Sequence, residues 1–83
     1  MTMTKDEIQE RLTTLMVEQF EVERERIRRE ARLYEDLDID SIDAVDLMVR
    51  LREITGKRIN PDDFKNARTI QDVVDTVHRI VSE

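Results

Sequence analysis

Residues 35–43 read Glu35-Asp36-Leu37-Asp38-Ile39-Asp40-Ser41-Ile42-Asp43. This acidic stretch leads directly into a segment with helical character, residues 41–54, whose apolar positions are Ile42, Val45, Leu47, Met48, Val49, Leu51 and Ile54. Asp40 has the residue type of a helix N-cap, and Gly56 that of the residue after a helix C-terminus. These positions cover a wider part of the helix surface than a single apolar stripe, so we expect some of them to lie outside the core or to face a cavity.

Amphipathic segments on either side of this helix predict three more helices. The first begins near Thr4, where Thr4 and Glu7 have capping-box spacing, and the last begins near Thr69. A short one occupies residues 60–66, because Asn-Pro-Asp-Asp combines a cap, a proline and acidic residues in the first turn. The apolar face of the first helix consists of Ile8, Leu12, Leu15, Met16 and Phe20. That of the last helix consists of Ile70, Val73, Val74, Val77, Ile80 and Val81. We predict a single all-α domain over residues 1–83, a small four-helix bundle with a short third helix.

A long loop is expected between the first two helices, at residues 21–40. Its first part is rich in Glu and Arg, which favours either an extension of the first helix or a separate turn. Its apolar anchors are Ile27, Ala31, Leu33, Tyr34 and Leu37. A linker of this length in a compact domain indicates a functional reason, and its last residues deliver Ser41.

The composition disfavours several classes of protein. There is no cysteine, hence no disulfide framework or thiolate metal site, and no apolar run long enough to span a membrane. The start of the chain lacks the apolar core of a secretory signal, so we expect a cytoplasmic protein, and we expect a monomer. With 20 acidic and 14 basic residues, the net charge of −6 disfavours nucleic acid and favours basic protein partners.

Acidic side chains gather around Ser41. Residues 33–49 contain six acids and no base, whereas residues 21–32 combine four acids with five arginines. Most charged runs are only solvated surface. A patch centred on one serine nevertheless favours a docking surface for basic partners.

Ser41 is unsuited to nucleophilic catalysis. A serine hydroxyl needs a base, the single histidine is His78 in the last predicted helix, and no glycine-flanked elbow surrounds the serine. A phosphate on the serine oxygen would instead lie near the positive end of the helix dipole. The plain alternative is that Ser41 is only a helix-start residue beside the Asp40 cap.

The ordered set of motifs resembles the acyl carrier protein family over nearly the whole chain. Its elements are the first helix, the loop anchors Ile27 and Leu33, Glu35-Asp36-Leu37, Asp40-Ser41-Ile42-Asp43, Val45-Asp46-Leu47, Ile59, the short acidic third helix and Thr69-Ile70. The spacing from Ser41 to Thr69 is similar to the family's without insertion or deletion. The resemblance implies a carrier and not an enzyme.

By that resemblance, Ser41 receives 4′-phosphopantetheine from coenzyme A through a phosphopantetheinyl transferase. The arm then holds acyl or polyketide groups as thioesters for a ketosynthase, an acyltransferase or ligase, and related enzymes of dissociated fatty-acid or polyketide synthesis. The implied docking residues are Asp36, Asp40, Ile42, Asp43, Val45, Asp46 and Met48. The apolar ones among them form part of the docking surface or the mouth of an acyl-sheltering cleft, and ordinary core packing is the competing interpretation, equally weighted for Val45.

The chain departs from the family pattern in three places. Asp38-Ile39 replaces the common Gly-Ala, Arg50 and Arg52 lie on the second helix where many fatty-acid carriers are acidic, and the arginines of residues 24–32 are unusual. These departures indicate specialised partners, and the chain looks like stand-alone carriers of bacterial polyene-type clusters.

Two alternatives remain open on the sequence, and a calcium site is disfavoured. Asp36-x-Asp38-x-Asp40 matches half of a calcium loop, but Ser41 replaces the required glycine and Leu47 the required glutamate, so we predict no metal site. An aminoacyl or D-alanyl carrier would keep the arm and change the cargo. A helical interaction protein without a prosthetic group would use the same helix face and leave Ser41 incidental.

Overall fold

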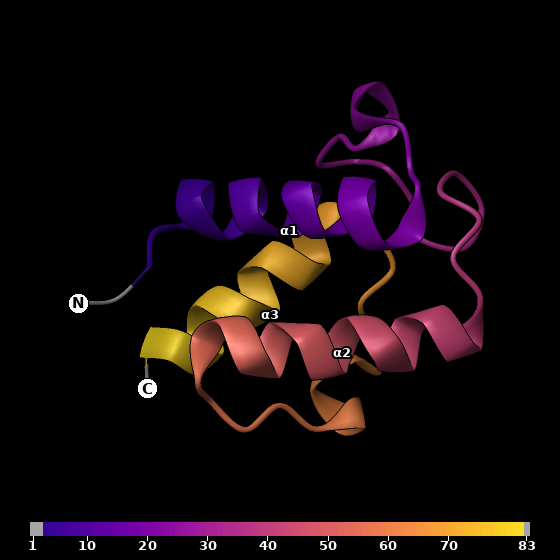
Figure 1. Cartoon of the computed structure of the whole chain (residues 1–83). Coiled ribbons are helices and arrows are strands. Elements are labelled where there is room, and N and C mark those ends of the chain that lie inside the picture. The colour runs from indigo at the N-terminus through magenta and orange to yellow at the C-terminus, as the bar shows by residue number, and fades with distance from the viewer. Residues whose placement is uncertain (1–2, 83) are drawn as a thin grey trace.

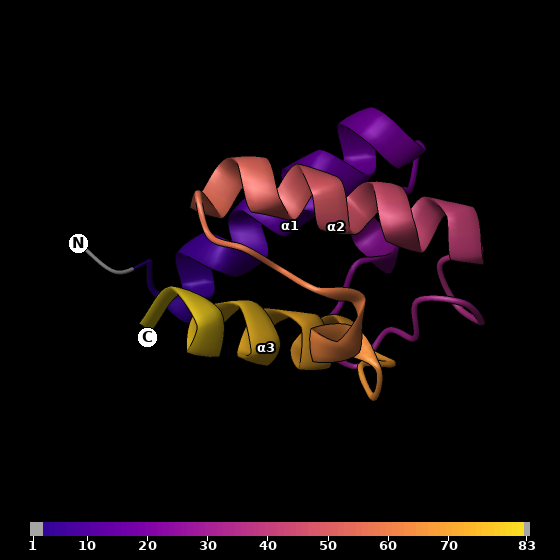
Figure 2. The same cartoon turned by 90° about the horizontal axis from the view of Figure 1, so that it is seen from below.

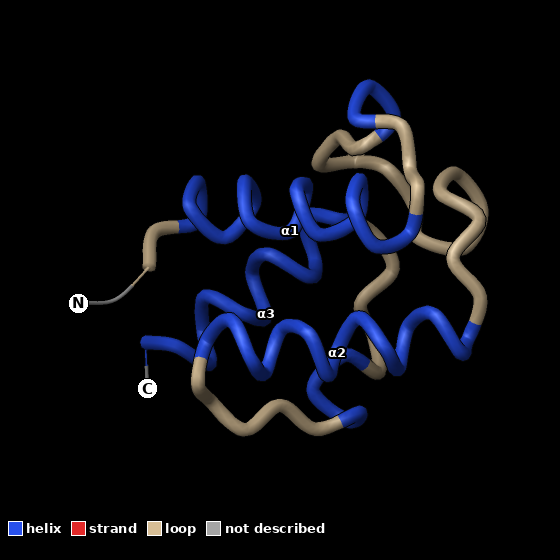
Figure 3. Tube along the Cα trace, in the orientation of Figure 1, coloured by secondary structure: helices blue, strands red, loops and turns tan. Residues whose placement is uncertain are grey.

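The computed structural model describes residues 3–82 and contains three α-helices and two short 3-10 helices. The elements in chain order are α1 (Lys5–Phe20), η1 (Arg24–Arg26), α2 (Ser41–Thr55), η2 (Pro61–Phe64) and α3 (Ile70–Ser82) (Figures 1 and 3). Within residues 3–82 there is no strand, only an isolated bridge between Arg32 and Thr69. The predicted all-helical fold is therefore confirmed.

The predicted four-helix count is not confirmed, because the third element is a four-residue 3-10 turn and not an α-helix reaching Asn66. Its backbone hydrogen bonds span three residues: the amide of Asp63 donates to the carbonyl of Asn60 at 2.9 Å, and the amide of Lys65 donates to the carbonyl of Asp62 at 3.3 Å. The chain then turns away, and the carbonyl of Arg68 accepts from the amide of Leu33 at 2.9 Å. The residues after η2 are therefore engaged with the loop of residues 21–40 and do not continue as an α-helix.

The helices form two layers. Figures 1 and 2 together show α1 and α2 side by side, with α3 crossing them on one face. The layers meet in one apolar core formed mainly by Ile8, Leu12, Met16, Leu47, Leu51, Ile59, Ile70, Val73, Val74 and Val77. Burying these side chains is the main stabilising contribution in so small a domain.

The helix ends follow the sequence signals. Thr4 Oγ1 accepts from the amide of Glu7 at 3.1 Å, and Thr69 Oγ1 accepts from the amide of Asp72 at 3.2 Å. α2 ends at Thr55 and is followed by Gly56, whose φ of 68° is the left-handed conformation that glycine adopts at no steric cost. The predicted caps are thus formed.

The loop of residues 21–40 packs through buried side chains spaced along it: Val22, Ile27, Ala31, Leu33, Leu37 and Ile39. Its Glu/Arg-rich part forms a separate turn, η1, and does not extend α1. The prediction that Tyr34 is an anchor was wrong, since this side chain is exposed. Backbone bonds from Ile70 to Ala31 and from Gln71 to Arg29 attach the loop to the start of α3.

Candidate functional site

Ser41 is the first residue of α2 and is exposed. Asp40 caps the helix, with its Oδ1 accepting from the amide of Asp43 at 2.8 Å, and the Asp43 carboxylate accepts in return from the amide of Asp40 at 3.4 Å. Within the described part of the chain, the Ser41 hydroxyl has no hydrogen-bond partner. It is therefore held at a capped helix terminus, near the positive end of the helix dipole, with its oxygen exposed to solvent.

The residues before Ser41 are anchored in the core by apolar side chains. Leu37 and Ile39 are buried, and the amide of Ile39 donates to the carbonyl of Leu33 at 3.0 Å. Between them, Asp38 has a φ of 56°, the left-handed conformation that a glycine would adopt more readily.

Asp36, predicted to contact partners, is engaged within this turn. Its Oδ2 accepts from the backbone amide of Arg32 at 2.8 Å and from Arg32 Nε at 3.2 Å, and Arg32 also pairs with Glu35. These hydrogen bonds from the Arg32 side chain and backbone lower the pKa of Asp36 from its ordinary value of 3.8. Asp36 thus closes the turn that leads to Ser41.

Stability below pH 4 tests this ion pair. Because the folded-state pKa of Asp36 is lowered, its contribution to stability is present above the unfolded pKa and disappears as the pH falls through the folded pKa. We expect Asp36→Asn to lower the urea midpoint slightly at pH 7, as suits an exposed pair, and to make no difference near pH 2. Glu30→Gln, which changes the same charge at an exposed position of the same loop, is the control. An equal loss at both pH values would contradict the assignment.

The outer face of α2 carries an exposed apolar stripe. Ile42 is 78 % exposed, Val45 58 % and Val49 44 %. Their spacing of three and four residues places them on one face, spanning about two turns or roughly 10 Å from the end that bears Ser41. Val49 was not predicted to be a surface residue, although its position seven residues after Ile42 places the two on the same face of the helix.

Acidic groups flank this stripe. Asp40 and Asp46 are exposed and Asp43 is half-buried. Asp46 Oδ1 lies 3.8 Å from Arg50 Nε, one turn further along α2. The structure therefore brings together Ser41, Asp40, Ile42, Asp43, Val45 and Asp46, whereas Asp36 belongs to the preceding turn.

Met48 faces a different region from the stripe. It is half-buried and lines a small, partly open pocket of about 40 Å³, together with Leu33, Tyr34, Ala44, Leu47, Leu51, Phe64, Ala67 and Val73. The lining is apolar, and the volume is close to that of one water molecule. Shelter of an acyl chain here would require α2 or the loop to move outward.

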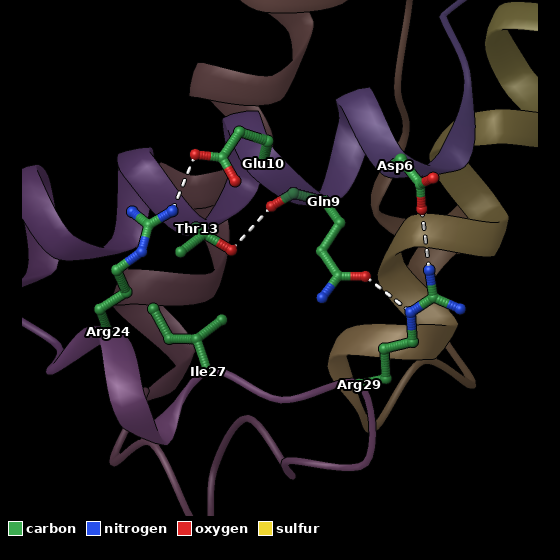
Figure 4. A pocket seen from close by; sticks show the side chains of 7 residues that line it. All are labelled: Asp6, Gln9, Glu10, Thr13, Arg24, Ile27 and Arg29. Carbon is green, nitrogen blue, oxygen red and sulfur yellow. Dashed lines mark hydrogen bonds and ion pairs between the residues drawn. The ribbon is translucent and has the colours of Figure 1, made fainter.

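A second hollow lies between α1 and the loop (Figure 4). Its polar side chains bond one another: Arg24 Nη2 to Glu10 at 2.8 Å, Arg29 Nη2 to Asp6 at 3.1 Å and Arg29 Nε to Gln9 at 2.8 Å. None of its lining residues belongs to α2 or to the turn before Ser41. These pairs attach the loop to α1.

The described residues place no histidine near Ser41 and form neither a metal site nor a membrane-spanning helix. Figures 1 and 2 place the start of α2 and the C-terminal half of α3, where His78 is half-buried, at opposite ends of the molecule. Across residues 3–82, no group of three or more His, Cys, Asp or Glu side chains could hold a metal ion. None of the helices in that range is long and apolar enough to cross a bilayer.

The chain is similar to known proteins along most of its length. Residues 10–77 match the family model described as "Phosphopantetheine attachment site". "Acyl carrier protein 2" of Ralstonia nicotianae is 46 % identical over 80 residues, covering 96 % of this chain and 99 % of the relative. "Acyl carrier protein" of Thermosynechococcus vestitus is 34 % identical over 80 residues, with the same coverage, and that of Lactobacillus johnsonii 32 % over 75 residues, covering 90 % of this chain and 94 % of the relative.

Proposed function

This chain belongs to the acyl carrier protein family, whose members carry phosphopantetheine and are not catalysts, and we propose that Ser41 is the residue that accepts this group. The observation that carries the proposal is the exposed Ser41 hydroxyl, which has no hydrogen-bond partner among residues 3–82, at the capped N-terminus of α2. A phosphodiester formed there lies at the favourable end of the helix dipole. The bound group supplies a thiol that holds acyl groups as thioesters.

We further propose that the carried groups are acyl or polyketide intermediates of a dissociated fatty-acid or polyketide/polyene-type pathway in the cytoplasm. The partners are a phosphopantetheinyl transferase, a ketosynthase, and an acyltransferase or ligase. Arg50 and Arg52 on α2 support specialised partners, because they interrupt the acidic character of the helix surface.

The proposed docking surface is the stripe of Ile42, Val45 and Val49 together with Asp40, Asp43 and Asp46. An apolar patch with a charged rim is the usual anatomy of an interface, and the acidic rim would attract basic partner surfaces. Asp36 contributes mainly by holding the turn, and Met48 by lining the pocket under α2.

Loading of the phosphopantetheinylated chain tests this function. The chain is incubated separately with malonyl coenzyme A and a malonyl-transferring acyltransferase, and with ATP, D-alanine and a D-alanine ligase. We expect a malonyl thioester, detected by mass and removed by hydroxylamine, and no loading of D-alanine. Loading of D-alanine alone would favour the aminoacyl carrier, and loading of neither by enzymes that charge a control carrier would overturn the acyl assignment.

A further inference from the structure

The turn that precedes Ser41 contains an unfavourable backbone conformation. Asp38, three residues before Ser41, has a φ of 56°. A side chain with a Cβ atom disfavours this conformation, although Asp tolerates it better than most residues. Something in the surrounding structure must therefore favour the turn.

Arg26 contacts this turn from a segment ten or more residues earlier in the chain. Its Nη2 donates a hydrogen bond to the carbonyl oxygen of Asp36 and lies 4.0 Å from Asp38 Oδ2. Arg26 thus hydrogen-bonds to the backbone before the left-handed residue, and its charge lies at the outer limit of an ion pair with the exposed carboxylate of that residue. A hydrogen bond from a guanidinium to a carbonyl is charge-assisted, and is stronger than a neutral one.

The backbone that bears the Arg26 side chain is held in place by neighbouring residues. Arg26 ends η1, and the next residue, Ile27, is buried and donates its amide to the carbonyl of Arg24 at 3.1 Å. Leu37 and Ile39 anchor the turn on either side of Asp38. The apolar anchors pack the side chains on either side of Asp38, and Arg26 adds a hydrogen bond to the backbone carbonyl of Asp36.

We propose that Arg26 is a positioning residue for the modification of Ser41: it holds the left-handed turn at Asp38 so that α2 begins at Ser41 in one orientation. This inference rests on the proposed function of Ser41. It also gives a physical reason for the Asp at position 38, because its carboxylate provides a second group for Arg26 to bind.

Arg28 provides a matched control. It lies two residues from Arg26, is exposed, and has no ion pair among residues 3–82. Arg28→Gln changes the net charge of the loop by the same amount as Arg26→Gln. A difference between the two variants therefore reports the contact with the turn and not the charge of the loop.

The test is the steady-state rate at which a broad-specificity phosphopantetheinyl transferase modifies the unmodified chain. We expect Arg26→Gln to lower kcat/KM for the chain about fivefold, because fewer molecules present Ser41 in the competent orientation. The KM for coenzyme A is expected to stay unchanged. Arg26→Lys should recover part of the loss, and Asp38→Gly in the Arg26→Gln background should restore the rate to within about twofold of wild type, since glycine adopts the turn unaided.

Amide hydrogen exchange of Leu37 and Ile39 gives a readout that does not depend on modification. These amides donate to the carbonyls of Arg32 and Leu33, and their exchange should accelerate in Arg26→Gln and slow again when Asp38→Gly is added. Equal rates for Arg26→Gln and Arg28→Gln, or no rescue by Asp38→Gly, would overturn the positioning role. Failure of the wild-type chain to be modified would overturn the proposed function, while exchange would still report whether Arg26 holds the turn.

Discussion

Replacing Ser41 with alanine is expected to abolish the uptake of phosphopantetheine and to leave the fold intact. The exposed Ser41 hydroxyl makes no hydrogen bond within the described residues, so its removal leaves no buried group unsatisfied. Asp40, which caps α2, is unchanged. We expect the free energy of unfolding to change by less than about 0.5 kcal/mol, as for most surface substitutions. In-gel fluorescence with a fluorescent coenzyme A analogue and urea denaturation measure the two quantities.

The chain contains its own control for this experiment. Ser82, the last residue of α3, is the other serine in the sequence and is also exposed. Ser82→Ala should be labelled at the wild-type rate. Labelling of Ser41→Ala would show that another residue accepts the group and would contradict the assignment of Ser41 as the attachment residue.

The second large effect is expected at Ile42, the most exposed apolar residue of the α2 stripe. We expect Ile42→Asp to lower the kcat/KM of the phosphopantetheinyl transferase for the chain by about 30-fold or more. A residue at an energetic hot spot of an interface contributes about 2 kcal/mol or more, which corresponds to that factor. Because Ile42 is 78 % exposed, the substitution removes little buried surface, and urea denaturation should show a stability close to wild type.

Gln19→Asp is the matched control, since it adds the same charge at an exposed position of α1. Its kinetics should equal those of wild type. If Ile42→Asp and Gln19→Asp behave alike, the stripe is not part of the surface that this enzyme contacts, and Val45 and Val49 lose their proposed role with it.

Local sequence signals predicted most of the framework. The caps at Thr4, Asp40 and Thr69 depend on residues three positions apart, so their hydrogen bonds follow from the sequence itself. The buried positions of α1 and α3 follow from helical periodicity for the same reason. Ser41 could be placed at a helix start because Asp40 and Asp43 form a local pair.

The remaining features depend on contacts that local patterns do not encode. Arg24, Arg26 and Arg29 bind groups ten or more positions away, so the sequence presented them as an unusual cluster and the structure gives them partners. The third helix was overestimated because the cap, proline and acidic residues at positions 60–63 mark where a helix starts and not how far it continues. Tyr34 was misassigned because the backbone follows no regular period in the loop, so an apolar residue there can face solvent.

The intact mass of the wild-type chain after incubation with coenzyme A and a broad-specificity phosphopantetheinyl transferase is the most direct measurement. We expect a gain of one phosphopantetheine group, located by fragmentation on Ser41. An unchanged mass, with no group present at the start and a control carrier fully modified in the same reaction, would contradict it and favour a helical interaction protein that shares the fold alone.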